Sequence, residues 1–190
     1  MSDRLPKLTT PPLVRDLATL DQALYETVTI TRTPTLDSAL RRLSAAADHS
    51  KLSFAVAAGL ALRGGRSRRA AVLGVAAIGV ASATANLVGK RLVRRRRPHR
   101  SEDSPFPGRH VPMPDSASFP SGHTASAVAF AAAVGPAFPA AAVPLGLLAC
   151  AVGYSRVHTG VHYPGDVIAG ALLGTGSAAL VLSLASRVED

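Results

Sequence analysis

Three short polar stretches of the chain carry the residue types that bind and transfer phosphate. They are KRLVRRRRP at 90–98, PSGH at 120–123 and SRVHTGVHYPGD at 155–166. Lysine and arginine bind anionic oxygens, and arginine favours the multidentate contacts that a phosphate offers. Histidine attacks phosphorus or transfers a proton near neutral pH. These stretches therefore predict chemistry on a phosphate group.

The third stretch contains a histidine and an aspartate at helical spacing. His162 and Asp166 are four residues apart, so their side chains lie on one face of a helix that Pro164 is suited to begin. A carboxylate bonded to one imidazole nitrogen fixes the tautomer and leaves the other nitrogen free to attack phosphorus. We predict His162 as the nucleophile, Asp166 as its orienting partner, and His123 as the general acid that protonates the leaving oxygen.

The remaining polar positions are suited to holding the phosphate. Lys90, Arg97 and Arg156 are cations that are stable together only around an anion. Ser121 and Gly122 open an apolar helix, and the unpaired N–H groups and positive dipole end of a helix N-terminus favour a phosphate. Glycine has no side chain to obstruct an oxyanion. We expect all of these residues to bind the phosphate group.

The composition indicates where this chemistry takes place. The chain has 190 residues, 47% of them hydrophobic but only 4% aromatic, and a net charge of +9. Strong positive charge has two common partners, nucleic acid and an anionic membrane surface. Residues 70–89 and 167–186 carry no charge, and about twenty apolar residues cross a bilayer. We therefore expect the partner to be the lipid bilayer, not nucleic acid.

The other apolar segments complete the predicted bundle. Residues 124–153 carry no charge and are too long for one span, so the GPAFP turn at 135–139 divides them into two helices. A further span is expected at 43–62, with Asp48 and Lys51 in the headgroup zone. The sequence predicts an all-α integral membrane bundle of about five transmembrane helices. The alternative is a soluble bundle whose apolar helices are buried on every face.

The N-terminal segment differs from the rest of the chain. The stretch LVRDLATLDQALYETV at 13–28 spaces its leucines three or four residues apart. That spacing predicts an amphipathic helix lying on the membrane surface, too short to cross it. We divide the chain into a polar N-terminal segment at 1–36 and a transmembrane catalytic domain at 37–190.

The predicted spans bring the polar stretches together. Two spans separate His123 from Arg156, so the chain leaves one membrane face and returns to it. No span separates Lys90 from Pro120. All three stretches are therefore expected to meet at one face and form a single site.

In this order and spacing the stretches resemble the signature of the type 2 phosphatidic acid phosphatase superfamily. The matching patterns are Lys-x6-Arg-Pro from Lys90, Pro-Ser-Gly-His from Pro120 and Ser-Arg-x5-His-x3-Asp from Ser155. The resemblance implies a metal-independent phosphatase that forms a phosphohistidine on His162, with its site at the lipid–water boundary. It also implies that Ser155 contacts the phosphate. Many members have six spans; here the amphipathic helix takes the place of the first.

The resemblance implies a lipid phosphate as substrate, with no cofactor. Candidates are phosphatidate, phosphatidylglycerol phosphate, and a polyprenyl phosphate or diphosphate. A metal site is not expected, because the sequence has no carboxylate-rich set. The alternatives are a phosphotransferase using the same phosphohistidine, a vanadate-dependent halide oxidase, and a non-catalytic protein that binds anionic lipid.

Several basic residues fall outside the signature. We interpret Arg91, Arg94, Arg95, Arg96 and Arg100 as an interfacial cluster that attracts anionic lipid, in preference to direct substrate contact. His158, also outside the pattern, is expected to have a structural role.

Overall fold

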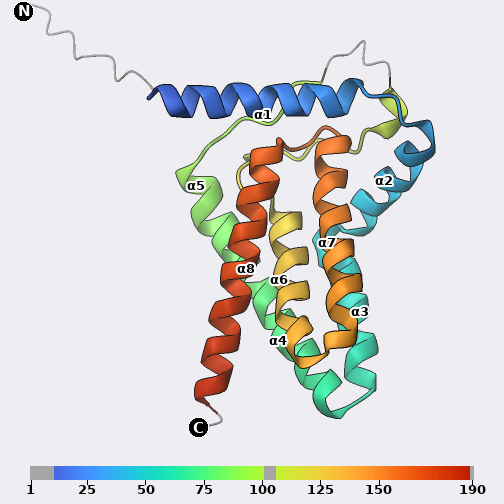
Figure 1. The fold of residues 1–190 in the computed structure, drawn as a ribbon, viewed down its shortest axis with the longest axis vertical. Coiled ribbons are helices and arrows are strands. Elements are labelled where there is room, and N and C mark those ends of the chain that lie inside the picture. The colour runs from blue at the N-terminus through green and yellow to red at the C-terminus, as the bar shows by residue number, and fades with distance from the viewer. Residues whose placement is uncertain (1–10, 101–105, 189–190) are drawn as a thin grey trace, which may run out of the picture.

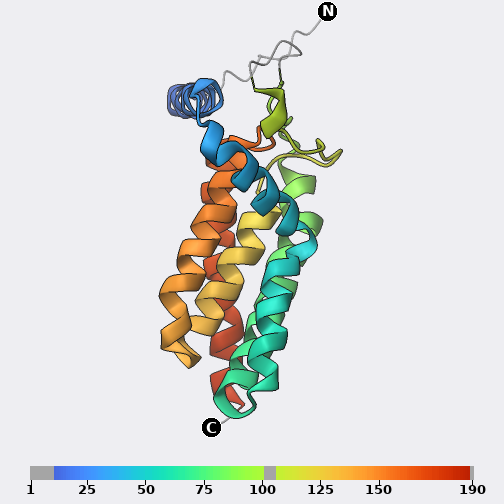
Figure 2. The ribbon, with the colours of Figure 1, turned by 90° about the vertical axis from the view of Figure 1, so that its right-hand side faces the viewer.

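The computed structural model describes residues 11–100 and 106–188, and all regular structure in these ranges is helical. The long helices run side by side along the long axis of the molecule (Figures 1 and 2). They are α3 (Lys51–Leu62), α4 (Gly65–Ala83), α6 (Gly122–Ala137), α7 (Pro139–His158) and α8 (Pro164–Arg187). The predicted all-α bundle is confirmed.

The N-terminal helix lies outside this bundle. Figure 1 shows α1 (Pro12–Ile30) lying across one end of it, and α2 (Pro34–Ala46) leads from there down to the bundle. Leu13, Leu17 and Leu20 are exposed on α1, as expected for an amphipathic surface helix. Residues 1–10 lie outside the described residues, and the domain division after residue 36 stays a prediction.

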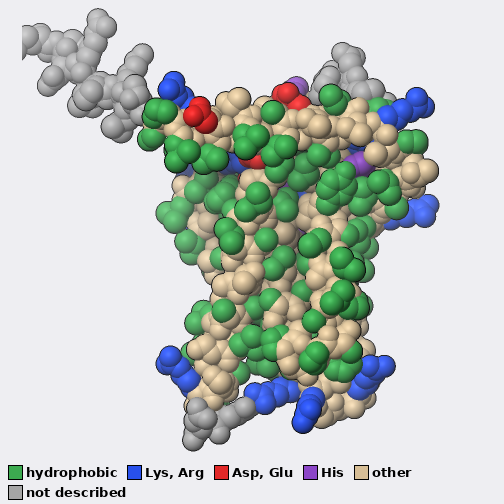
Figure 3. All heavy atoms as spheres, viewed as in Figure 1, with side chains coloured by type: hydrophobic (Ala, Val, Ile, Leu, Met, Phe, Trp, Pro, Cys, Tyr) green, Lys and Arg blue, Asp and Glu red, His purple; other side chains and the backbone are tan. Residues whose placement is uncertain are grey.

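The outer surface of the bundle is suited to lipid. Within the described residues, three helices are long and apolar enough to cross a membrane: Gly65–Leu92, Pro139–His158 and Pro164–Arg187. The first of these joins α4 to a π-helical segment (Thr84–Gly89) and to α5 (Lys90–Leu92). Figure 3 shows hydrophobic and uncharged side chains around the middle of the molecule and Lys and Arg side chains toward its two ends. The chain is an integral membrane protein.

The expected count of five spans is approximate. As predicted, the GPAFP turn separates two helices, because α6 ends at Ala137 and α7 begins at Pro139. However, α6 has 16 residues and α3 has 12, fewer than the roughly twenty that cross a bilayer. The segment 43–62, predicted as a span, is divided between the end of α2, a short 3-10 turn and α3. His49 and Ser50 have positive φ angles of 54° and 58°, which end the helical path between α2 and α3.

Small residues let the central helix pack closely. α6 packs against α4, α7 and α8. A Cβ atom at Gly174 of α8 would lie 2.5 Å from the Ala125 carbonyl oxygen, so glycine is needed at this contact. Ala125 and Ala129 are fully buried there. Close packing of glycine and alanine explains how a chain with few aromatic residues forms a core, and it places the N-terminal ends of α6 and α8 side by side.

Candidate active site

A cavity of about 300 Å³ opens at the end of the bundle where α6 begins. Residues from all three polar stretches line it, which confirms that the stretches meet. They are Lys90, Arg97, Gly122, His123, Arg156 and His162. Figure 1 shows that this end of the bundle is the one covered by α1.

The first turn of α8 orients His162. Asp166 is the third residue of that helix, and its Oδ2 atom accepts a hydrogen bond of 2.9 Å from the Tyr163 N–H. The same oxygen lies 3.4 Å from His162 Nδ1. Both side chains are buried, His162 with 2% of its surface exposed and Asp166 with none. The four-residue spacing thus makes one carboxylate both the helix cap and the histidine partner.

The protonation state of His162 suits a nucleophile. A carboxylate only accepts hydrogen bonds, so His162 Nδ1 carries the proton and Nε2 is left unprotonated, its lone pair facing the Arg97 guanidinium. Nε2 lies 3.2 Å from Nη1 of Arg97. Burial, with the charges of Arg97 and Arg156, lowers the pKa of His162 to about 4. The hydrogen bond to Asp166 acts in the opposite direction but is outweighed. The imidazole is therefore neutral near pH 7.

The cations of the cavity are poorly balanced by carboxylates. Lys90 Nζ donates to the Ser116 hydroxyl at 3.2 Å, and Arg97 Nε donates to the Ser116 carbonyl at 2.8 Å. Arg156 lies 3.8 Å from an oxygen of Asp48, and its buried Nε has no hydrogen-bond partner among the described residues. A cluster of one buried and two half-buried cations, held mainly by neutral acceptors, favours an anion.

Asp48 is a residue of the site that sequence reasoning missed. Its Oδ1 atom lies 2.7 Å from His123 Nε2, and both residues line the cavity. Because the carboxylate accepts, His123 Nε2 carries a proton that faces the cavity. One signal was present in the sequence: Asp48 is the only carboxylate between Asp37 and Glu102.

The two serines predicted to bind phosphate are engaged in helix structure. Ser121 is fully buried and caps α6, its hydroxyl accepting a bond of 2.9 Å from the Thr124 hydroxyl. The Ser155 hydroxyl donates to the Val152 carbonyl at 2.7 Å within α7. Neither is among the residues that line the cavity. Gly122 does line it, with open space where a Cβ atom would lie.

The arginine run divides into two groups. Arg91, Arg94 and Arg96 are exposed, as expected of an interfacial cluster. Arg95 and Arg100 turn inward, so the interpretation was wrong for these two. Arg95 Nη1 binds Asp166 Oδ1 at 3.0 Å, and Arg100 donates to backbone carbonyls, including that of Thr159 at 2.8 Å. The partners of Arg95 and Arg100 lie far away in the sequence, so a local sequence pattern could not reveal them.

His158 has the structural role expected of it. It is buried on α7 and its Nε2 lies 2.9 Å from Oδ1 of Asp37 on α2. The same carboxylate pairs with the buried Arg109 at 3.0 Å. This cluster holds α2 and the segment before α6 against α7.

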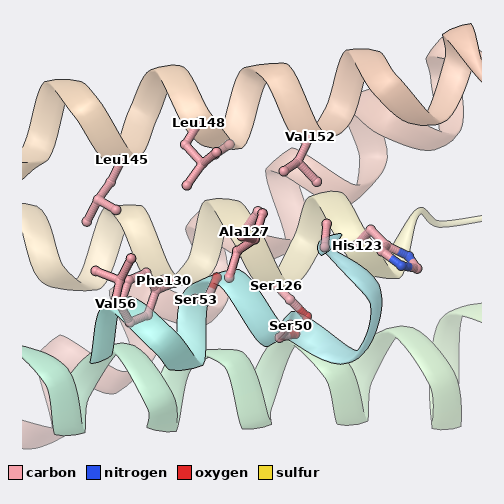
Figure 4. A pocket seen from close by; sticks show the side chains of 13 residues that line it. Ser50, Ser53, Val56, His123, Ser126, Ala127, Phe130, Leu145, Leu148 and Val152 are labelled. Atoms are coloured by element: carbon pink, nitrogen blue, oxygen red, sulfur yellow. The ribbon is translucent and has the colours of Figure 1, made fainter. Parts of the chain in front are cut away.

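A narrow apolar groove leads away from the cavity between α3, α6 and α7 (Figure 4). His123 and Ser126 line both the groove and the cavity. Further along, the groove is lined by hydrophobic side chains from the three helices: Val56, Phe130, Leu145, Leu148 and Val152. The polar cavity is thus joined at His123 and Ser126 to a small apolar pocket within the bundle.

Comparison with known proteins places this arrangement in a family. A family model described as the PAP2 superfamily matches residues 70–189. The decaprenylphosphoryl-5-phosphoribose phosphatase of Mycobacterium tuberculosis is 40% identical over 123 residues, which are 63% of this chain and 63% of that protein. The lipid A 1-phosphatase of Rhizobium etli is 43% identical over 98 residues, 47% of this chain and 39% of the relative. The chain therefore matches less than two thirds of the length of these relatives.

Solved structures share the fold. The PAP2-type phosphatidylglycerolphosphate phosphatase of Bacillus subtilis superposes with a TM-score of 0.72 at 22% identity, covering 91% of this chain and 88% of that one. LpxE of Aquifex aeolicus superposes with a TM-score of 0.70 at 26% identity, covering 86% and 95%. The bundle is therefore that of known membrane phosphatases.

Proposed function

The chain belongs to the PAP2 superfamily, and from that premise we propose that it is a metal-independent phosphatase of a membrane lipid phosphate that works through a phosphohistidine on His162. The observation that carries the proposal is the cavity itself. The oriented imidazole of His162 on one side faces the imidazole of His123, whose Nε2 is bonded to Asp48, on the other, with cations between them. This is the set of groups that an in-line phosphoryl transfer requires.

In the first step the substrate phosphate lies among Lys90, Arg97 and Arg156. His162 Nε2 attacks phosphorus with its lone pair, and the bond from phosphorus to the leaving oxygen breaks. The bonding electrons go to that oxygen, which takes the Nε2 proton of His123 in its imidazolium form, the form that the negative charge of the bound phosphate favours. The products are the dephosphorylated lipid and a phosphohistidine.

In the second step water replaces the lipid alcohol in the cavity. His123, now neutral, takes a proton from the water as its oxygen attacks phosphorus. The phosphorus–nitrogen bond breaks, its electrons return to His162 Nε2, and inorganic phosphate leaves. Asp166 keeps the Nδ1 proton of His162 in place throughout, so each step ends with His162 in a state that the next can use.

A lipid is a better substrate than a soluble ester for two reasons. The cavity lies at one end of an apolar bundle, at the level of lipid headgroups, and the groove beside His123 is lined with hydrophobic side chains. The mycobacterial relative is named for a decaprenyl-linked phosphoribose. This adds a candidate to those named from the sequence, a phosphate monoester on a polyprenyl-linked sugar, and favours it over them.

The test is phosphate release by purified protein in detergent with excess chelator. Wild type and His162→Ala are compared on phosphatidate, phosphatidylglycerol phosphate, polyprenyl diphosphate and a polyprenyl-linked sugar phosphate. We expect chelator-resistant release by wild type and none by His162→Ala, because that variant has no nucleophile. Equal melting temperatures of the two proteins control for folding.

Other outcomes are informative. Release that persists in His162→Ala contradicts the nucleophile assignment, and release that chelator abolishes contradicts the metal-free mechanism. Trapped phosphohistidine without phosphate release points to the phosphotransferase alternative, in which another acceptor replaces water.

A further inference from the structure

We propose that Arg95 and Asp21 are positioning residues for the nucleophile, through which α1 sets the catalytic rate. The inference rests on the proposed function and concerns the same site. Arg95 Nη1 binds Asp166 Oδ1 at 3.0 Å, and its Nη2 binds Asp21 Oδ2 at 2.6 Å. One guanidinium thus joins the surface helix α1 to the carboxylate that orients His162.

Arg95 restricts the rotation of the Asp166 carboxylate. Oδ2 of Asp166 faces His162 and the Tyr163 N–H, while Oδ1 faces Arg95. If the carboxylate rotates, it loses contacts on both oxygens. Asp166 is fully buried, and a buried carboxylate without a cation is costly. Arg95 is therefore placed to keep the carboxylate both charged and aligned.

Arg95 is itself held in place, at its guanidinium and at its backbone. Its Cζ atom lies 4.0 Å from the ring centroid of Tyr163, the residue next to the nucleophile. Its backbone carbonyl accepts a bond of 2.9 Å from the Ser118 N–H. A stacked and bidentate arginine has little freedom, so it transmits the position of each carboxylate to the other.

Asp21 anchors α1 to the same turn. Its Oδ1 atom accepts a bond of 2.6 Å from the N–H of Gly165, which precedes Asp166 in α8. A Cβ atom at Gly165 would lie 2.9 Å from Asp21 Oδ2, so a side chain there would displace the Asp21 carboxylate. Tyr25, one turn further along α1, packs its ring 5.3 Å from that of Tyr163. α1 therefore contacts the nucleophile segment at two points.

The position of α1 depends on the membrane surface. Its Leu17 and Leu20 are exposed, and with Ile168 of α8 they border a cavity of about 450 Å³ between α1 and the bundle. An amphipathic helix with such a face lies in the lipid interface. Asp21 and Arg95 border the same cavity, so a shift of α1 acts directly on the pair.

The first test measures kcat and KM separately in wild type and variants. We expect Asp21→Asn to lower kcat about tenfold and Arg95→Gln about a hundredfold, with KM unchanged, the scale typical of residues that orient a catalytic ligand. Arg95→Lys should restore part of the loss. Asp16→Asn on α1 and Arg94→Gln in the arginine run are matched controls, both exposed and expected to keep wild-type kcat.

A second variant tests the geometry without removing charge. Gly165→Ala places a methyl group against the Asp21 carboxylate and should lower kcat as Asp21→Asn does. Gly176→Ala, further along α8 with open space at its Cβ position, is the control. Melting temperatures show whether any variant is unfolded under the assay conditions.

A third readout does not depend on turnover. In ¹⁵N-histidine spectra, assigned with His162→Ala, the His162 signals report which ring nitrogen carries the proton. We expect Arg95→Gln and Asp21→Asn to shift these signals and Asp16→Asn to leave them unchanged. If wild type releases phosphate from no lipid, the proposed function fails, while these spectra still decide the positioning role.

Two results would overturn the inference. One is an unchanged kcat together with unchanged His162 signals in Asp21→Asn and Arg95→Gln. The other is a rise in KM without a fall in kcat, since Arg95 would then contact substrate and not orient the nucleophile.

Discussion

At the scale of single residues, the pairing of each histidine with a carboxylate divides their roles. His162 places its proton on Nδ1, toward Asp166, and leaves Nε2 as a lone pair. His123 carries a proton on Nε2, where it faces Asp48. The two cavity-facing nitrogens therefore differ by one proton, as a nucleophile and an acid must.

This division predicts how activity depends on the leaving group. An aryl phosphate releases a stable phenolate without protonation, whereas an alkyl phosphate needs the acid. For His123→Ala we expect a fall in kcat/KM of about a hundredfold or more on alkyl phosphates, within the usual range for general acids, and a much smaller fall on aryl phosphates. Asp48→Asn should show the same trend more weakly.

The measurement is kcat/KM for both variants across short-chain phosphates of graded leaving-group acidity. The exposed His99 provides the control variant His99→Gln, which should match wild type throughout. An equal loss on every substrate would show that His123 binds phosphate without donating a proton.

The sequence alone predicted those site residues that belong to a short motif with a fixed spacing. Lys90, Gly122 and His162 were predicted from local patterns and line one cavity. Asp48 and Arg95 were not predicted as site residues, because their partners lie 75 and 71 positions away and no local pattern encodes such contacts. A motif position also does not reveal where a short side chain points, as the capping hydroxyl of Ser121 shows.

At the scale of helices, the α6–α8 contact determines how closely the site is assembled. Gly170 and Gly174 of α8 lie against the α6 backbone, and a Cβ atom at Gly170 would lie 2.5 Å from the Ser121 carbonyl oxygen. The Ser121 N–H in turn donates to the Asp166 carbonyl at 2.9 Å. Close approach of the two helices therefore brings PSGH next to the nucleophile turn.

Gly174→Ala tests this packing. The added methyl group meets backbone atoms of α6, which cannot move aside as a side chain would, so we expect a loss of about 1–3 kcal/mol in unfolding free energy. The measurement is denaturant unfolding in detergent. Gly176→Ala, with open space around it, should lose nothing; equal stability of the two variants would mean that α8 does not need this close contact.

Helix boundaries were the least predictable feature of the elements. Charge-free runs predicted spans at 70–89 and 167–186, but the helices extend to Leu92 and begin at Pro164. Hydropathy places a span's end at the first charge, whereas here the helix continues through Lys90, which lines the cavity, and α8 begins before the buried Asp166. The break at His49 was hidden for a different reason, since its left-handed backbone has no glycine to mark it.

At the scale of the whole molecule, the site lies between two media. The cavity's cations and histidines are at the end of the bundle that α1 covers, while the groove beside His123 lies between α3, α6 and α7. A phosphate headgroup fits the cavity, whereas the groove has only about 20 Å³ of open volume, so a hydrocarbon chain can enter it only if the lining side chains move apart. Discrimination between lipids and soluble phosphates then depends on the groove, and hydrolysis depends on the cavity.

The variant Ala127→Leu tests the role of the groove in lipid discrimination separately from the role of the cavity in hydrolysis. Ala127 lines the groove near His123 but not the catalytic cavity, and leucine there fills space that a lipid chain would use. Loss of apolar contact equivalent to one or two methylenes predicts a rise in KM of about five- to tenfold for a long-chain lipid phosphate. Turnover of a short-chain soluble phosphate should not change, because its phosphate meets the same residues.

Ala58→Leu on α3 makes the same substitution at an exposed position and should leave both substrates unaffected. The measurement is KM and kcat for both substrates in the same detergent micelles, so that only the chain length differs. If Ala127→Leu impairs the soluble phosphate as much as the lipid, leucine has disturbed the cavity and the chain lies elsewhere. If it impairs neither, the groove is not occupied during turnover, and the hydrocarbon chain stays on the outer face of the bundle.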